Sequence, residues 1–392
     1  MGSAAWISGA IGLAGLVQST AGFAMVRRFV AQPTPAPGYR PPVTILKPLY
    51  GHEPLLEQAL ATACSQNYPE YQIVFGVTRS RDPALAVVHR LQTRFPHADI
   101  AVVVNADQHG QNRKVSNLMN MLQAAKHDVI VIADSDIHAL PDYLDRLVAA
   151  LEQPRVGLVT TLYTGWPVSA RVVPQLGAAQ INYGFLPSVL FGRALGRQDC
   201  LGATMALNRA TLGRIGGFEA LVPHLADDNV LGRKVRELGL HVQLASAVPS
   251  TTVPEETIGA LFRHELRWAR TIRRLAPAGF AASALQYSLG WAALAAALAG
   301  SAWGLVLFGG VWAVRSALAR GIDTALRRQG SAPVGLRAPI WLLPLRDLLS
   351  LIVMASSYFG RHVEWRGHDL IADSGRPLSP ATLGLEEAVN PR

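Results

Sequence analysis

The 392-residue sequence predicts an α/β fold, in which a doubly wound and mostly parallel sheet is flanked by membrane helices near both ends of the chain. Three observations predict it. Short aliphatic runs alternate with helix-length segments between residues 41 and 151, long uncharged stretches occur near both ends, and 50% of the residues are hydrophobic. That hydrophobic fraction is high for a purely soluble protein, so we expect membrane segments as well.

The N-terminal segment is expected to cross a membrane. Residues 4–26 carry no formal charge and are long enough to span a bilayer core of about 30 Å as one helix. Arg27 and Arg28 follow directly. Because a cleaved signal peptide carries its positive charge before the apolar run, we expect residues 1–28 to be a retained anchor. The positive-inside tendency then places the N-terminus outside and the rest of the chain in the cytoplasm.

The main domain is expected over residues 41–275, after a proline-rich, extended linker at residues 29–40. Its first half alternates strands with helices, and the carboxyl ends of such strands form the binding edge of a doubly wound sheet. The expected strands cover residues 43–47, 73–77, 100–104 and 129–133, and the expected helices cover 54–64, 83–95, 114–125 and 141–151. Residues 156–253 are less regular, with a strand expected at 157–162 and a helix at 229–238.

Two further membrane segments are expected after the main domain. Residues 276–337 begin with a stretch nearly free of charge, which can form a hairpin of two short helices turning near Gly300, followed by a basic loop. Residues 338–392 contain a last apolar segment and the C-terminal tail. In that segment Arg346 and Asp347 would be costly in lipid unless they are paired or near an interface, so a re-entrant helix and a full span both remain open.

The charge and cysteine content indicate a cytoplasmic membrane surface. Cys64 and Cys200 are the only cysteines, which provides no disulfide framework and fits a reducing compartment. A net charge of +9 is compatible with nucleic acid, but many arginines lie beside apolar segments, where they suit anionic lipid headgroups. We therefore expect anionic lipids and no nucleic acid as partners, because of Arg263, Arg267, Arg270, Arg273 and Arg274.

The most informative motif lies in residues 129–136. An aliphatic strand delivers Asp134 and Asp136 to its carboxyl end, and residues two apart on an extended chain project to the same side. Two hard oxygen ligands in this arrangement suit Mg²⁺ or Mn²⁺, and such a cation can neutralise a diphosphate. The motif therefore predicts chemistry on a nucleotide-sugar. A plain turn with side-chain hydrogen bonds to its own backbone is the alternative.

Two earlier strand ends carry candidates for binding a nucleotide. The first expected strand runs through Lys47 and Pro48 into a glycine turn, and Asp82 follows the second strand. A carboxylate at that place can accept hydrogen bonds from uracil or ribose. An N-cap for the helix opened by Pro83 explains Asp82 equally well.

A helix start and a small-residue loop add further candidates. Lys114 and Asn117 share one helix face, where a lysine can reach a phosphate; a solvated basic turn is the alternative. Later, Gly202, Ala203 and Thr204 form a loop that permits the backbone to approach a sugar closely, although packing explains the loop as well.

Two later motifs complete the set. Asp227 and Asp228 open a helix, and one of them can act as a general base that takes a proton from a hydroxyl, although helix N-termini also favour Asp for structural reasons. His264, Arg267 and Trp268 lie on an amphipathic helix just before the hairpin. There Arg267 can clamp a diphosphate and Trp268 can stack on a sugar, or the pair can belong to an interfacial belt.

Taken together, these motifs resemble the membrane-bound glycosyltransferases of families 2 and 21, and specifically the ceramide glucosyltransferase group. The resemblance covers nearly the whole chain, and its motifs occur in the family's order: LKPLYG, RDPA, NRKVSNLM, DSD, GATMALNR with GGF, ADD and HELRW. It implies a glycosyltransferase A-type fold, a UDP-sugar donor, a lipid acceptor and metal-assisted transfer with inversion.

The resemblance also implies roles for individual residues. Asp228 is expected to be the catalytic base, and Asp134 and Asp136 to hold the metal. The donor is expected to contact Lys47, Pro48, Asp82, Lys114, Asn117, Asp134, Arg267 and Trp268, and the acceptor Gly202, Ala203, Thr204, Asp227 and His264. His264 stands where the family has Gln or Arg, which leaves its role open.

The combination of HELRWARTIR with the tail VEWRGHDL resembles most closely the hopanoid-biosynthesis glycosyltransferases of bacteria. Those enzymes transfer N-acetylglucosamine from UDP to bacteriohopanetetrol, so we expect a bacterial inner-membrane enzyme whose catalytic domain faces the cytoplasm. The alternative is an enzyme of the same class that transfers glucose to ceramide or to another lipid. A processive polysaccharide synthase would need a tunnel that so few apolar segments hardly provide, and a non-catalytic membrane scaffold is the alternative of a different class.

Overall fold

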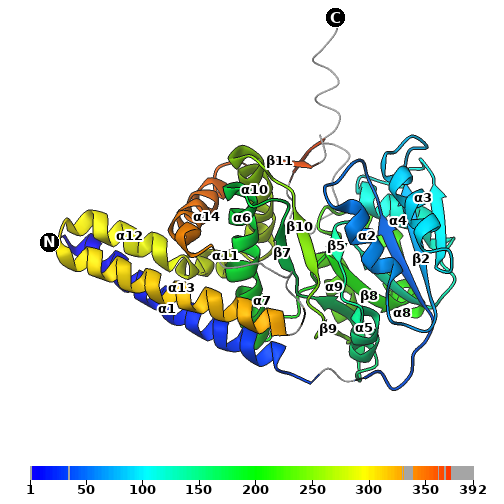
Figure 1. Ribbon diagram of the computed structural model, residues 1–392, viewed down its shortest axis with the longest axis horizontal. Coiled ribbons are helices and arrows are strands. Elements are labelled where there is room, and N and C mark those ends of the chain that lie inside the picture. Colours follow the sequence, from blue (N-terminus) through cyan, green and yellow to red (C-terminus); the bar gives the residue numbers. More distant parts are fainter. Residues whose placement is uncertain are drawn as a thin grey trace, which may run out of the picture.

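The computed structural model describes residues 2–33, 36–328, 330 and 339–360, together with the backbone of residues 362–365 and 368–371. A long helical bundle extends from one side of an α/β domain, and the N-terminus lies at the end of the bundle farthest from that domain (Figure 1). The tail motif VEWRGHDL lies outside the residues whose side chains are described.

The α/β domain is built on a seven-stranded sheet in the order β3-β2-β1-β4-β8-β6-β9. All strands run in one direction except β8, which is antiparallel to both β4 and β6. The strands are β1 (Val43–Pro48), β2 (Tyr71–Val77), β3 (Asp99–Val104), β4 (Val129–Ala133), β6 (Val156–Thr161), β8 (Thr204–Asn208) and β9 (His241–Ala245). The predicted mostly parallel α/β sheet is therefore confirmed.

Helices cover both faces of the sheet, which explains why β4 is aliphatic and buried over its whole length. One apolar core lies between the sheet and α2 (Leu56–Cys64), α3 (Ala84–Arg94) and α5 (Tyr143–Leu151). A second core lies on the other face, under α4 (Arg113–Leu122), α8 (Arg209–Arg214) and α9 (Asp227–Glu237). The short turn η2 (Phe218–Ala220) packs into the same core.

A small second sheet lies beside the carboxyl end of β4. It contains β5 (Ile137–His138), β10 (Ser250–Val253) and β7 (Thr164–Pro167), with β10 in the middle. β10 is antiparallel to β5 and parallel to β7. Because β5 directly follows the DSD motif, this sheet brings the segment before the amphipathic helix α10 (Ile258–Leu275) next to that motif.

Within the described residues, three helical segments are long and apolar enough to cross a membrane. They are α1 (Ser3–Val30), α13 (Ala302–Arg328) and residues 340–357, which comprise η4 (Ile340–Leu342) and α14 (Leu343–Ser357). A fourth is possible if a bent pair counts as one span. This pair is α11 (Pro277–Ala282) with η3 (Ser283–Gln286) and, at an angle of 62°, α12 (Ser288–Ala299).

The bundle packs closely because α1 presents small residues to its neighbours. A Cβ atom on Gly15 would lie 1.9 Å from the carbonyl oxygen of Leu285, and one on Gly12 would lie 3.3 Å from the backbone nitrogen of Ala292. Small residues of this kind let the backbones of membrane helices approach each other.

The turn between α12 and α13 falls at Gly300, whose φ of 57° is left-handed. α13 then continues through most of the region expected to be a basic loop. Two of its charged residues have partners inside the protein: Arg315 Nη2 donates to Asp347 Oδ1 at 3.2 Å, and Asp323 accepts from the Tyr183 hydroxyl at 2.9 Å. These two charges are therefore satisfied inside the protein, whereas Arg320, Arg327 and Arg328 of the same helix are exposed.

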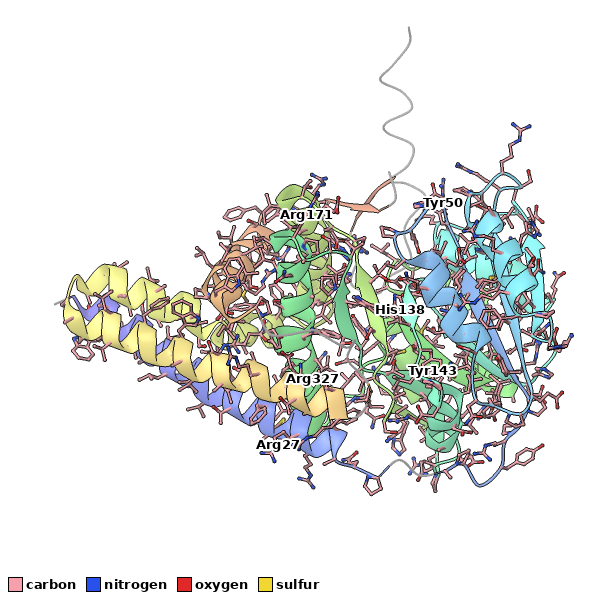
Figure 2. All side chains as sticks on the ribbon, viewed as in Figure 1. Arg27, Tyr50, His138, Tyr143, Arg171 and Arg327 are labelled. Carbon is pink, nitrogen blue, oxygen red and sulfur yellow. The ribbon has the colours of Figure 1, made fainter. Side chains whose placement is uncertain are left out.

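The junction between bundle and domain consists of α6 (Val172–Gln180), the π-helix η1 (Ile181–Phe185), α7 (Leu186–Ala194) and α10. Arg27 and Arg327 lie where α1 and α13 reach this junction (Figure 2). Beyond α14, β11 (His362–Trp365) pairs antiparallel with β12 (His368–Ile371).

Candidate active site

Asp134 lies at the carboxyl end of β4 between two lysines. Its Oδ1 accepts from Lys114 Nζ at 2.6 Å, and its backbone oxygen accepts from Lys47 Nζ at 2.8 Å. Its side chain is 37% exposed, so the carboxylate remains accessible. Lys47 is buried in β1, and burial lowers its pKa to about 8 although Asp136 and Asp134 oppose the shift. Both lysines thus bind the DSD motif from neighbouring elements.

Asp136 is more enclosed than Asp134. Its Oδ2 accepts from the Thr251 hydroxyl of β10 at 2.5 Å. Burial, followed by the repulsion of Asp134, raises the pKa of Asp136 from 3.8 to about 6. The intervening Ser135 donates to Glu53 Oε2 at 2.5 Å, which adds a third carboxylate to the neighbourhood. The site is therefore rich in negative charge.

Lys114 connects Asp134 with the segment predicted to bind the acceptor. Its Nζ lies 3.5 Å from the carbonyl oxygen of Gly202, and a Cβ atom on Gly202 would lie 2.9 Å from Asp228 Oδ2. Burial alone would lower the pKa of Lys114, but Asp134, Asp227 and Asp228 raise it above its ordinary value. Three carboxylates from two segments that lie far apart in the sequence thus act on one ammonium group.

The helix α9 begins with the two predicted carboxylates. Asp227 Oδ1 accepts from Asn112 Nδ2 at 3.1 Å, and burial raises the pKa of Asp227 although Lys114 opposes the shift. Burial and the adjacent Asp227 raise the pKa of Asp228 from 3.8 to about 6. Its Oδ1 accepts from the backbone nitrogen of Asn229 at 2.7 Å. At neutral pH Asp228 is mostly ionised and more basic than an ordinary aspartate.

Asp82 orders the loop that follows β1. Its two oxygens lie 3.0 and 3.1 Å from the backbone nitrogen of Gly51, and Oδ1 also accepts from the backbone nitrogen of Ala84 at the start of α3. The helix-capping alternative is therefore present in the structure. A carboxylate can accept further hydrogen bonds. Binding of the nucleotide-sugar by Asp82 therefore stays a prediction.

Asn117 and Pro48 both lie next to Gly76 in β2, the strand that precedes Asp82. Asn117 Nδ2 donates to Gly76 O at 2.9 Å, and Pro48 is paired with Gly76 in the sheet register. Asn117 Oδ1 is buried and has no hydrogen-bond partner within the described residues.

The loop residues predicted to meet the acceptor are placed differently from one another. Gly202 faces Asp228, and the oxygen of Ala203 accepts from the backbone nitrogen of Asp134 at 3.1 Å. The Thr204 side chain is instead fully buried, where its hydroxyl is hydrogen-bonded to Tyr143 at 2.8 Å. The structure thus brings Gly202 and Ala203 to the carboxylates and leaves the Thr204 side chain in the core.

The motif on α10 is tied to the end of β10. His264 Nδ1 is hydrogen-bonded to Glu255 Oε1, and the His264 ring lies edge-on to Trp268 with 4.4 Å between centroids. Burial would raise the pKa of Glu255, but His264 and the nearby Arg267 lower it below its ordinary value. Since Thr251 on β10 holds Asp136, one short strand links the DSD motif to His264 and its neighbours.

The expected extended arrangement of Asp134 and Asp136 is wrong: β4 ends at Ala133, and the Ile137 backbone nitrogen donates to the Asp134 backbone oxygen at 3.3 Å, so the two residues lie in a turn. They still belong to one acidic neighbourhood, since Asp134 helps to raise the pKa of Asp136. Within the described residues, no three His, Cys, Asp or Glu side chains form a complete metal-binding group. Mg²⁺ and Mn²⁺ sites commonly use one or two carboxylates and complete their shell with substrate phosphate oxygens and water. Burial is the largest cause of the raised pKa of Asp136, and the repulsion of Asp134, the second cause, is the part that such a cation would relieve.

Sequence reasoning missed several residues that support this site. Thr251 and Asn112 each bond a predicted carboxylate, Glu255 bonds His264, and Glu53 bonds Ser135. Tyr163 was missed as well: after burial, the largest causes of its raised pKa are Asp228, Asp134 and Asp136. Of these residues only Asn112 had a usable signal, because it directly precedes a helix, where Asn is a favoured cap.

The fold and the acidic strand ends define the chain as a protein of glycosyltransferase A-type fold. A solved mannosyltransferase from Pyrobaculum calidifontis, in complex with GDP-mannose and Mn²⁺, is similar over 91% of this chain and 99% of its own, with a TM-score of 0.53 and 21% identity. This likeness confirms the predicted fold.

The sequence profile of glycosyl transferase family 21 matches residues 8–378, so the chain belongs to that family. A ceramide glucosyltransferase of Komagataella phaffii is 34% identical over 136 residues, which are 33% of this chain and 27% of the relative. Ceramide glucosyltransferase 1 of Caenorhabditis elegans is 24% identical over 233 residues, which are 59% of this chain and 49% of the relative. The chain thus matches half or less of the length of these curated relatives.

Proposed function

We propose that this chain is a membrane-bound glycosyltransferase that transfers a sugar from a UDP-sugar to a hydroxyl group of a membrane lipid, with inversion at the sugar. The observation that carries the proposal is the convergence of Asp134, Asp227 and Asp228 around Lys114. Such a set can help to hold a cation for a diphosphate and can take a proton at the same place.

In this reaction Asp228 takes the proton from the acceptor hydroxyl, and the oxygen attacks the anomeric carbon from the face opposite the diphosphate. Its raised pKa suits this role, because a stronger base accepts a proton more readily. Lys114 and Arg267 stabilise the negative charge that develops on the leaving UDP, and Trp268 packs against the sugar. Asp227 and Gly202 contact the acceptor.

Asp134 and Asp136 would hold a divalent cation, which supplies charge neutralisation for the diphosphate when it is bound. Lys47 and Thr251 support this pair, since each bonds one of the two residues. Asp82, Pro48 and Asn117 belong to the side of the site where the nucleotide binds.

The lipid reaches the site from the cytoplasmic leaflet. Arg27 and Arg28 lie in the last turn of α1, and Arg327 and Arg328 lie in the last turn of α13. Figure 2 shows Arg27 and Arg327 on the side of the bundle nearest the α/β domain. Positive charge on this side supports a cytoplasmic catalytic domain and contact with anionic headgroups. The bacterial inner membrane is proposed from the resemblance to the hopanoid enzymes alone.

We propose N-acetylglucosamine as the sugar and a hopanoid, bacteriohopanetetrol, as the acceptor. The support is the resemblance of HELRWARTIR and the C-terminal tail to the hopanoid enzymes. The second candidate is transfer of glucose to ceramide, which the similarity to ceramide glucosyltransferases favours.

The test incubates the full chain in lipid nanodiscs with Mn²⁺ and labelled UDP-GlcNAc, UDP-glucose or GDP-mannose. Bacteriohopanetetrol, ceramide and diacylglycerol are offered as acceptors, and the lipid product is identified by mass spectrometry. A GlcNAc-hopanoid product supports the proposal, and a glucosylceramide product in its place would replace it by the second candidate. No product from any pair would overturn both.

Asp228→Asn is the matched control for catalysis. The amide keeps the size of the side chain but does not act as a base, so we expect kcat to fall about 10²- to 10⁴-fold while UDP still binds. A non-catalytic scaffold would bind UDP equally well in both forms and transfer no sugar in either.

A further inference from the structure

A buried ion pair joins α14 to the helix that carries His264, Arg267 and Trp268. Two nitrogens of Arg346 each donate to one oxygen of Glu265 at 2.7 Å, and the two side chains are only 3% and 8% exposed. A two-pronged contact of this kind fixes direction as well as distance.

Glu265 is well placed to control how α10 is rotated about its own axis. It is adjacent to His264, whose ring contacts Trp268 one helical turn further on. Successive residues of a helix point in different directions, so a residue held towards α14 fixes the direction in which its neighbours point. A residue that holds Glu265 in one direction can therefore set the orientation of His264, Arg267 and Trp268.

The residues that directly follow α14 are also joined to α10. Arg270 Nη2 donates to Phe359 O at 2.7 Å, and the Arg273 guanidinium lies 5.0 Å from the centre of the Tyr358 ring. Apolar side chains fill the space between these contacts, among them Leu261, Ala269, Leu349 and Val353. Figure 1 shows the two helices together at the junction between the bundle and the α/β domain. The apolar contacts hold the helices together, and the ion pair adds a defined orientation.

The opposite face of α14 is exposed and apolar. Trp341 precedes this helix, and Leu345, Leu348 and Ile352 follow at helical spacing, with exposed fractions between 48% and 60%. Such a face suits the lipid of the membrane in which residues 340–357 are a candidate span. α14 thus presents an exposed apolar face on one side and packs against α10 on the other.

We propose that Arg346 is a positioning residue for sugar transfer: by holding Glu265, it makes the membrane helix α14 set the geometry of the donor site. The inference rests on the proposed function, because the α10 motif is assigned there to the diphosphate and the sugar. It adds a membrane residue to the determinants of donor binding.

The test compares Arg346→Met with Arg315→Met in full-length protein in nanodiscs. Each variant removes one buried guanidinium from the same bundle and takes the ion-pair partner from one carboxylate, Glu265 in the first and Asp347 in the second. Asp347 keeps its hydrogen bond from the Leu289 backbone nitrogen at 2.9 Å. Only the first carboxylate belongs to α10. We expect the KM for the UDP-sugar to rise about tenfold or more in Arg346→Met, and to stay within about twofold of the wild type in Arg315→Met. An equal KM in the two variants would overturn the inference.

A double variant separates positioning from mere stability. Glu265→Leu combined with Arg346→Met leaves no buried charge unpaired, so the amount of folded protein should recover. The raised KM should persist, because the directed contact is still missing. Recovery of the wild-type KM would overturn the inference. Where Arg346→Met does not fold, Arg346→Lys, which keeps the charge but lacks the planar fork, takes its place and should also raise the KM.

Two further measurements keep the proposed function and this inference apart. Binding of UDP with Mn²⁺ to the wild type is measured by calorimetry, and its absence would count against the proposed function. Amide exchange in residues 264–275 is measured in the same proteins without any substrate. Faster exchange in Arg346→Met than in Arg315→Met supports the positioning role, and equal exchange overturns it.

Discussion

The pH dependence of transfer tests whether Asp228 is the base. A general base must be ionised to accept a proton, and burial together with Asp227 raises the pKa of Asp228 from 3.8 to about 6. With that pKa the ionised fraction falls from about 0.9 at pH 7 to about 0.1 at pH 5, so kcat/KM should fall about tenfold between these values.

Asp227→Asn identifies the group responsible for this fall. It removes the neighbouring negative charge, while its amide oxygen can still accept the hydrogen bond from Asn112. The acid limb should therefore move to lower pH. The shift should be smaller than the roughly two units that separate an ordinary aspartate from Asp228, because burial is the larger cause and remains.

The assay follows transfer of labelled sugar across the pH range at saturating Mn²⁺. A lower maximal rate in Asp227→Asn does not affect the test, because only the pH at which kcat/KM falls on the acid side is compared between the proteins. An acid limb that stays near pH 6 in this variant would refute the assignment of Asp228, and so would a transfer rate in Asp228→Asn that remains close to that of the wild type.

Three further predictions concern the cation, Lys114 and the bundle. Mn²⁺ with UDP should raise the melting temperature of the wild type more at pH 7.5 than at pH 5, because protonation of Asp136 near pH 6 competes with the cation. Asp136→Asn should abolish the increase in melting temperature. Lys114→Met should weaken UDP binding, measured by calorimetry, and should move the acid limb to higher pH because Lys114 lowers the pKa of Asp228. Gly15→Ala should destabilise the protein by about 1–3 kcal/mol in thermal unfolding, whereas Gly309→Ala, which has open space around it, should not.

The sequence was sufficient to predict most of the sheet. The expected strands at 43–47, 73–77 and 129–133 all lie within or at the bounds of observed strands, because parallel strands covered on both faces leave long aliphatic runs. The position of β8 was not predicted, since an antiparallel strand inserted among parallel ones follows from tertiary packing and leaves no local pattern. The length of α13 was not predicted, because Arg315 interrupts the apolar sequence and only the fold places Asp347 beside it.

The residues around the carboxylates show what a sequence pattern omits. Asp134 and Asp228 were predicted, and their motifs contain them at fixed positions. Thr251 and Glu255 were not predicted, because β10 lies far from the DSD motif in the sequence and meets it only by pairing with β5. The pairing of Arg346 was expected in general terms from the cost of burying its charge, but Glu265 as its partner required the fold.

The charge balance of the site indicates what donor binding must change. Lys114 is now paired with Asp134 Oδ1, one of the oxygens that a divalent cation would need. A UDP-sugar brings its own negative charge, which gives the Lys114 ammonium a second anionic partner while it remains close to Asp227 and Asp228. Donor and cation would therefore bind together more favourably than either alone, because the diphosphate draws the lysine away from the carboxylate that the cation requires. This exchange of partners requires the flexible side chain and compact charge of a lysine. Lys114→Arg is therefore expected to bind UDP more tightly than Lys114→Met but more weakly than the wild type.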